Sequence, residues 1–145
     1  MSGSQREDYL LRQVKVLAAM IARLVGLRTC GQIEEARAEL ERAYGAVLGP
    51  EAELVRRADS STAAMLLGSP ERIFLFAQLV REEAAQAGED GLRKLLTARA
   101  AELGKEAARR APENDEIRCF LAELSAGDDG PSLAPSFERE PKGSS

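Results

Sequence analysis

Apolar residues recur every three or four positions through the first part of the chain, from Gln5 to Arg28. This spacing lines up one face of a helix and predicts a helix over residues 5–28. Flanking apolar residues widen the stripe to an arc of roughly 220°, about twice the usual minimum for a surface helix. Such a helix needs two packing partners, either two helices of its own chain or one of its own and one from a second subunit. The stripe consists of Leu10, Val14, Leu17, Ile21 and Leu24.

A pattern of small residues follows the turn at Gly31. Ala36, Leu40 and Ala43 share one helical face, and charged residues occupy the other faces. Because small side chains let another helix approach closely, this segment is expected to be the second arm of a helical hairpin. The Gly-Pro pair that begins at Gly49 marks its end, since glycine commonly follows the last helical residue and proline cannot continue the helix.

The same periodicity continues in further segments. Serine at Ser69 followed by proline and an acid is a strong helix start. Within residues 92–111, Leu92 is expected to face inward together with the later leucines of its stripe. Period-two alternation of β-branched residues is missing, so no sheet is expected. The sequence predicts an all-α fold of about five to seven helices. Beyond the first two, they cover 51–58, 62–67, 70–87, 92–111 and a last segment capped by Asn114 or Asp115.

The two ends of the chain differ from this central part. Residues 1–4 are expected to be a flexible start, with Ser4 and Glu7 in a capping-box pattern. Residues 127–145 contain three prolines, four serines and many charges, with almost nothing to bury. Such a segment cannot offset its own ordering entropy and is expected to be disordered. The sequence therefore predicts one all-helical domain over residues 5–126.

Composition narrows the function classes. The net charge of −4, with basic and acidic residues interspersed, argues against binding to nucleic acid, which needs clustered Lys and Arg. The longest apolar run, from Val16 to Ala22, is far shorter than a bilayer requires, and the first residues are too charged for a signal peptide. We therefore expect a cytoplasmic protein that binds no nucleic acid and no membrane.

Groups that carry common enzyme chemistry are scarce. The chain has no histidine, which is the commonest general base and metal ligand. Cys30 and Cys119 are expected to be free thiols rather than a disulfide, and Cys119 is expected to pack beside the apolar stripe of the last helix. Acidic pairs such as Glu34-Glu35 fit solvated helix faces, because no E-x-x-H motif accompanies them. We expect no enzymatic activity, no metal and no cofactor.

The small-residue pattern resembles a known repeat. Glycine followed by Ala36, Leu40 and Ala43 resembles the second helix of a tetratricopeptide repeat. A partial second copy ends at Ala107 and Pro112, although Gly104 stands where the repeat has a bulky residue. The aromatic and Leu-Gly pair of the first repeat helix is missing. The resemblance implies tetratricopeptide-like stacked helical hairpins.

The order of segments over about 125 residues also resembles a family of uncharacterised bacterial tetratricopeptide-like proteins, a domain of unknown function. The resemblance lies in Arg6-Glu7-Asp8-Tyr9-Leu10, the long apolar helix after it, and the turn Gly31-Gln32-Ile33-Glu34-Glu35-Ala36. It implies no established activity, and no catalytic residue follows from it.

Two functional hypotheses remain at this point. The first is a non-enzymatic protein-interaction module with an unknown protein partner, self-associating as a homodimer through Val16, Met20 and Leu27. Its motivation is that fewer than three stacked repeats are marginal alone. The alternative is a regulatory helical domain that binds a small anionic ligand on the basic face of residues 92–111, through Lys94 and Arg99.

Overall fold

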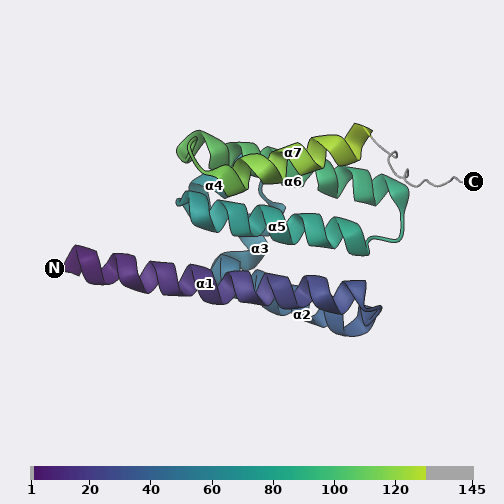
Figure 1. Cartoon of the computed structure of the whole chain (residues 1–145), viewed down its shortest axis with the longest axis horizontal. Coiled ribbons are helices and arrows are strands. Elements are labelled where there is room, and N and C mark those ends of the chain that lie inside the picture. The colour runs from purple at the N-terminus through teal and green to yellow at the C-terminus, as the bar shows by residue number, and fades with distance from the viewer. Residues whose placement is uncertain (1, 130–145) are drawn as a thin grey trace, which may run out of the picture.

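The computed structural model describes the backbone of residues 2–129 and the side chains of Asp8, Tyr9 and residues 11–126. Within these residues the chain forms seven α-helices and one 3-10 turn, with no strand (Figure 1). The expected all-α fold is therefore confirmed. The elements are α1 (Ser2–Thr29), α2 (Ile33–Leu48), η1 (Gly49–Glu51), α3 (Ala52–Arg57), α4 (Ser60–Leu67), α5 (Pro70–Gln86), α6 (Asp90–Arg110) and α7 (Asp115–Asp129).

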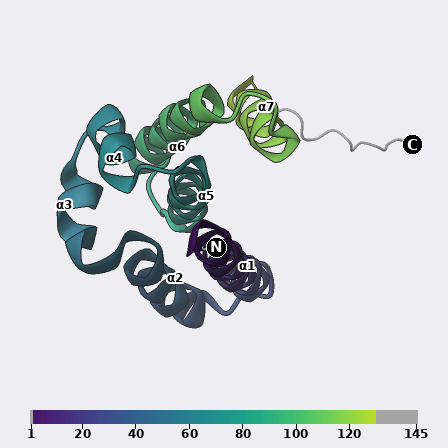
Figure 2. The ribbon, with the colours of Figure 1, turned by 90° about the vertical axis from the view of Figure 1, so that its left-hand side faces the viewer.

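Two helical hairpins are stacked, and a further helix follows them. The first hairpin is α1 and α2, joined through Gly31, whose φ of 82° lies in the left-handed region that glycine adopts without strain. The second hairpin is α5 and α6, and α7 packs on α6. Seen along the helices in Figure 2, α5 lies between α1 and α7 and is set back from both. On the other side, α3 and α4 connect α2 to the second hairpin.

The helix at the centre of the molecule is α5, which packs against α1, α2, α4 and α6. Of the stripe that periodicity predicts, Ile73, Ala77, Val80 and Ala84 are buried, whereas Ala87 follows the end of the helix and is only partly buried. Residues outside that stripe are buried as well, namely Leu75, Phe76, Leu79 and Glu82. A helix with neighbours on several sides buries more than one stripe of residues, which the periodicity alone could not reveal.

Small residues allow close helix packing at two places. Ala36 and Ala43 are fully buried and Leu40 is 3% exposed, which confirms the expected inner face of α2. In α6, a Cβ atom at Gly104 would lie 2.8 Å from Leu121 Cδ2 and 3.2 Å from Phe120 Cδ2. The glycine that departs from the repeat pattern thus lets α7 approach α6 closely.

Two helices of its own chain, α2 and α5, cover part of the apolar arc of α1. With 28 residues α1 is about 42 Å long, whereas the 16 residues of α2 span about 24 Å. The first half of α1 therefore extends beyond α2 (Figure 1). Tyr9 and Leu11, which are 56% and 58% exposed, lie in that half, and Val16, 57% exposed, follows directly after it.

Some expected boundaries and orientations were wrong. Helix α1 begins at Ser2, so Ser4 lies inside the helix rather than at its cap. Helix α7 continues to Asp129, since its own residues include no proline and the next proline is Pro131. Residue 1 and residues 130–145, most of the expected tail, lie outside the described residues. Leu92 is 43% exposed rather than inward, because α4, with eight residues, is too short to cover the length of α6.

Asn114 caps α7, as one of the two expected alternatives, because its Oδ1 accepts a hydrogen bond from the Ile117 backbone N–H at 3.1 Å. Across residues 2–129 we find no helix with the length and apolarity that a bilayer crossing needs.

Candidate binding groove

Three hollows follow one another along α5, on the side where α1 and α7 stand apart. The first hollow, of about 570 Å³, lies between α1, the end of α2 and the start of α5. The middle hollow of about 120 Å³ lies between α1, α5 and α7, and the third of about 340 Å³ lies between α5 and α7. Val14 and Glu71 line both the first and the middle hollow. Phe74, Gln78 and Glu116 line both the middle and the third, so the three form one groove.

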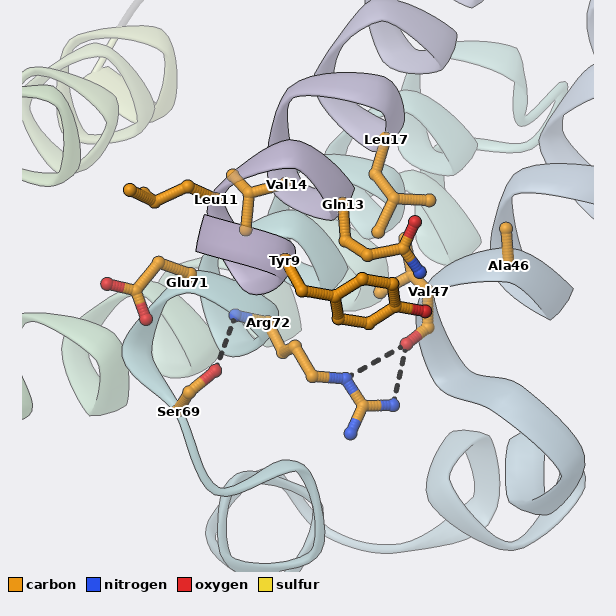
Figure 3. A pocket seen from close by; sticks show the side chains of 10 residues that line it. All are labelled: Tyr9, Leu11, Gln13, Val14, Leu17, Ala46, Val47, Ser69, Glu71 and Arg72. Carbon is orange, nitrogen blue, oxygen red and sulfur yellow. Dashed lines mark hydrogen bonds between the residues drawn. The ribbon is translucent and has the colours of Figure 1, made fainter. Parts of the chain in front are cut away.

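The first hollow has walls from three helices (Figure 3). Tyr9 and Gln13 extend from α1 toward Val47 at the end of α2, whereas Leu11 and Glu71 lie on the opposite side. Its volume falls within the range of about 300–1,000 Å³ that is typical of ligand pockets. The lining is mostly apolar, which favours an apolar group as the occupant.

Arg72 holds the wall of this hollow in place. Its Nε and Nη2 donate to the Val47 carbonyl at 3.2 and 2.7 Å. That carbonyl belongs to the last turn of α2, where carbonyl groups lack partners within the helix. Ser69 caps α5 by accepting a hydrogen bond from the Arg72 backbone N–H at 3.2 Å. The two bonds to the Val47 carbonyl join α2 to α5, and they use side-chain donors of Arg72 that would otherwise be free to bind a ligand.

Aromatic side chains form part of the lining of the third hollow. The rings of Phe74 and Phe120 meet edge to face, with centroids 5.3 Å apart and planes at 88°. The Arg81 guanidinium lies 4.5 Å from the Phe120 centroid and donates to Glu123 at 2.9 Å. This hollow thus combines aromatic surface with an ion pair that joins α5 to α7.

The opposite side of α5 is closed by paired charges. The Tyr44 hydroxyl donates to Glu83 at 2.6 Å, and Arg56 lies over the Tyr44 ring, 3.9 Å from its centroid. Burial raises the pKa of Tyr44 far above its usual value, and the bond to Glu83 raises it further. Since Tyr44 is 2% exposed and lines none of the three hollows, it cannot reach a substrate in the groove. We assign this cluster a structural role.

A second ion pair closes the end of the α1/α2 hairpin. Arg28 donates to Glu82 through Nε at 2.7 Å and Nη2 at 3.2 Å. The hydrogen bond to Glu82 raises the pKa of Arg28 above its already high value, so the pair stays charged. Because Glu82 is 4% exposed, this pair explains a buried carboxylate without any catalytic role.

Of the candidate self-association, anion-binding and cysteine residues, all but one lie outside the linings of the three hollows. Val16 is exposed, whereas Met20 and Leu27 pack partly against the core. Lys94 is exposed, but Arg99 donates to the carbonyls of Val55 and Arg56, each at 3.3 Å. The structure therefore does not bring the two cations together as open donors. That the pair binds an anion remains a prediction.

The two cysteines are exposed free thiols. Cys119 was expected to pack against the apolar stripe, and this was wrong, because its side chain faces the third hollow instead. It is the exception among those candidate residues.

Sequence reasoning missed most of the groove. Its lining residues look ordinary in the sequence because α1, α5 and α7 each contribute only a few of them. One signal was present: Phe74 and Gln78 lie next to the α5 stripe at a spacing of four residues, which indicates a second face.

Within the part of the chain that the structure describes, no group of three Cys, Asp or Glu side chains could hold a metal ion. Comparison with protein-family models, with curated proteins and with solved structures gives no match.

Proposed function

We propose that this chain is a non-enzymatic protein-interaction module whose groove along α5 binds a segment of another protein. The observation that carries the proposal is the continuity of the three hollows, which share lining residues from α1 to α7. A continuous groove between helices, with apolar and charged residues in its lining, suits an amphipathic segment of a partner. In keeping with the resemblance, we describe the module as tetratricopeptide-like, bacterial and cytoplasmic.

The stacking of the helices supports this description. In the α1/α2 hairpin the small residues Ala36 and Ala43 lie fully buried, and in α6 Ala100 and Ala107 do the same at the corresponding spacing of seven. Helices of 17 and 21 residues in the second hairpin are longer than those of the repeat. The module is thus a divergent one, in which α1, α5 and α7 line one surface.

A displayed peptide library tests this function directly. Peptides of about 15 residues are selected on the full chain and on a variant whose groove is filled, Gln78→Trp. Gln78 lines both the middle and the third hollow, so an indole there occupies the space between them. Gln32→Trp, at an exposed position before α2, is the matched control.

We expect peptides that bind the unchanged chain and the control but lose at least tenfold in affinity for Gln78→Trp. If every selected peptide binds the filled variant equally well, the groove is not the binding site. A library that yields no binder at all removes the proposal.

Self-association is a separate part of the proposal. The exposed apolar residues Tyr9, Leu11 and Val16 of α1 support a contact between two copies.

A further inference from the structure

We infer that the groove selects a cationic amphipathic segment, in which apolar residues alternate with Lys or Arg. This inference rests on the proposed function and specifies the chemistry of its partner. It depends on which charges in the groove are already paired within the chain.

Two carboxylates lie at the joints of the groove without an ionic partner. Glu71 stands where the first hollow meets the middle one, and Glu116 stands where the middle one meets the third. Among the side chains that the structure describes, neither takes part in an ion pair. Both residues are exposed, so a partner's ammonium or guanidinium group can reach them.

The cations that line the groove are engaged by the chain itself. Arg72 donates to the Val47 carbonyl, and Arg81 donates to Glu123. The remaining acid of the lining, Asp115, is paired with Arg118. The lining of the three hollows thus carries four carboxylates against two cations, and Glu71 and Glu116 are the carboxylates without an ion pair among the described residues, so complementarity requires a positive segment.

Both carboxylates also lie in the first turn of a helix, where a negative charge is favoured by the helix dipole. That accounts for an acid at each position, but it does not explain why each stands at a joint between hollows. A carboxylate in the first turn of a helix can stabilise that helix and bind a partner's cation at the same time. Binding and stability must therefore be measured separately.

The order of features along the groove defines the partner further. From one end to the other, an apolar hollow is followed by a carboxylate, a second hollow, a second carboxylate and the hollow with the Phe74 and Phe120 rings. A bound segment satisfies this order when its apolar residues enter the hollows and its cations lie between them. A guanidinium group gains further from the half-buried Phe74 ring, since the Phe120 ring is already covered by Arg81.

Other occupants from this chain fit the charge less well. A second copy carries a net charge of −4. The segment after the last described residue has two acids, Glu138 and Glu140, and two bases, Arg139 and Lys142, so it offers no net positive charge. An external cationic segment is the occupant that complements Glu71 and Glu116.

Two synthetic peptides of about 18 residues test the inference. Both carry leucine at helical spacing, with lysine at the polar positions of one and glutamate at those of its twin. Fluorescence anisotropy with the full chain measures their affinities. We expect the lysine peptide to bind at least tenfold more tightly than its twin, and to weaken as salt is raised from about 0.05 to about 0.3 M.

Neutralising the two carboxylates tests their role. Glu71→Gln and Glu116→Gln should each weaken the lysine peptide by about threefold, and together by about tenfold. Glu113→Gln, at an exposed position outside the three hollows, is the matched control and should leave affinity unchanged. Thermal unfolding of each variant shows whether the fold is kept.

Equal binding of the two peptides, no binding of the lysine peptide, or equal effects of Glu113→Gln and Glu116→Gln would each overturn the inference. A dimer that Gln78→Trp converts to a monomer would overturn it as well, because a second copy would then fill the groove. These failures differ from failure of the proposed function. If library peptides bind in the groove but are neutral or acidic, the interaction module stands and only the cationic partner is excluded.

Discussion

The two long sides of α5 carry the same residue types in different surroundings. Phe76 lies on the closed side, 1% exposed, with its ring 6.1 Å from Tyr44 and below the Arg99 guanidinium at 5.4 Å. Phe74, two residues earlier, lies on the groove side, half-buried against Phe120. One phenylalanine is enclosed by the core, whereas the other lines a hollow that is open to solvent.

Charged groups differ between the two sides in the same way. On the closed side, Glu83 accepts a hydrogen bond from the Tyr44 hydroxyl. On the groove side, Glu71 keeps no ion pair within the described residues. A buried charge is costly unless it is paired, whereas an exposed one is solvated by water. The closed side therefore pairs its charges within the chain, whereas the groove side leaves Glu71 open to solvent, as the proposed binding of a partner requires.

The largest expected effect comes from the two phenylalanines. Phe76→Ala should lower the free energy of unfolding by about 4 kcal/mol, because a fully buried ring leaves a cavity. Phe74→Ala should cost about 1.5 kcal/mol, since the ring is only half-buried, but it should abolish groove-dependent peptide binding. Urea denaturation and anisotropy measure the two quantities. Equal destabilisation by both substitutions would remove the distinction between the two sides.

Next in size is the close contact of α6 with α7. Gly104→Leu should destabilise the fold by about 2 kcal/mol, because even its Cβ would lie 2.8 Å from Leu121 and the additional atoms force α7 outward. Gly45→Leu is the control, since a Cβ there meets nothing within 4 Å. The control should be stabilised slightly by the better helix propensity of leucine. Thermal unfolding followed by circular dichroism tests both, and a destabilised control would refute this reasoning.

A smaller effect is expected at Arg99, which holds α3 and α4 against α6. Arg99→Ala leaves the carbonyls of Val55 and Arg56 without this donor and should cost about 1.5 kcal/mol. Lys94→Ala, at an exposed position on the same helix, should change stability by less than about 0.5 kcal/mol. The same two variants test the anionic-ligand alternative. A thermal shift with an anionic metabolite that both substitutions abolish would support that alternative instead.

The smallest change in stability is expected at Val16, an exposed position of α1. Val16→Glu should change the free energy of unfolding by less than about 0.5 kcal/mol, yet it should reduce self-association. Met20→Glu should lower the free energy of unfolding by about 1 kcal/mol because Met20 packs against the core. A loss of assembly in this variant would therefore reflect the weaker fold as well as the lost contact. Light scattering at high micromolar concentration measures the assembly. A clean monomer before any substitution would eliminate the dimer.

Much of the fold could be predicted from periodicity and turn residues. The face of Ala36, Leu40 and Ala43, the glycine turn before it and the serine cap at Ser69 are local features, so the chain order alone reveals them. The ends of α1 and α7 were less predictable, because no single residue marks where a helix frays.

The groove could not be predicted in the same way. Phe74, Gln78 and Glu116 come from two helices that are far apart in the chain, and only packing places them around the same hollows. Tertiary contacts also decide which charged side chains bond within the chain. Arg72, for example, donates to a carbonyl 25 residues away.

The sequence by itself determined the helices, the first hairpin and the shortage of catalytic groups, because these follow from neighbouring residues and composition. Tertiary structure alone decided that α5, and not α1, is the central helix, because burial depends on how many neighbours a helix meets. It also decided that Gly104 admits α7 and that a groove remains between α1 and α7.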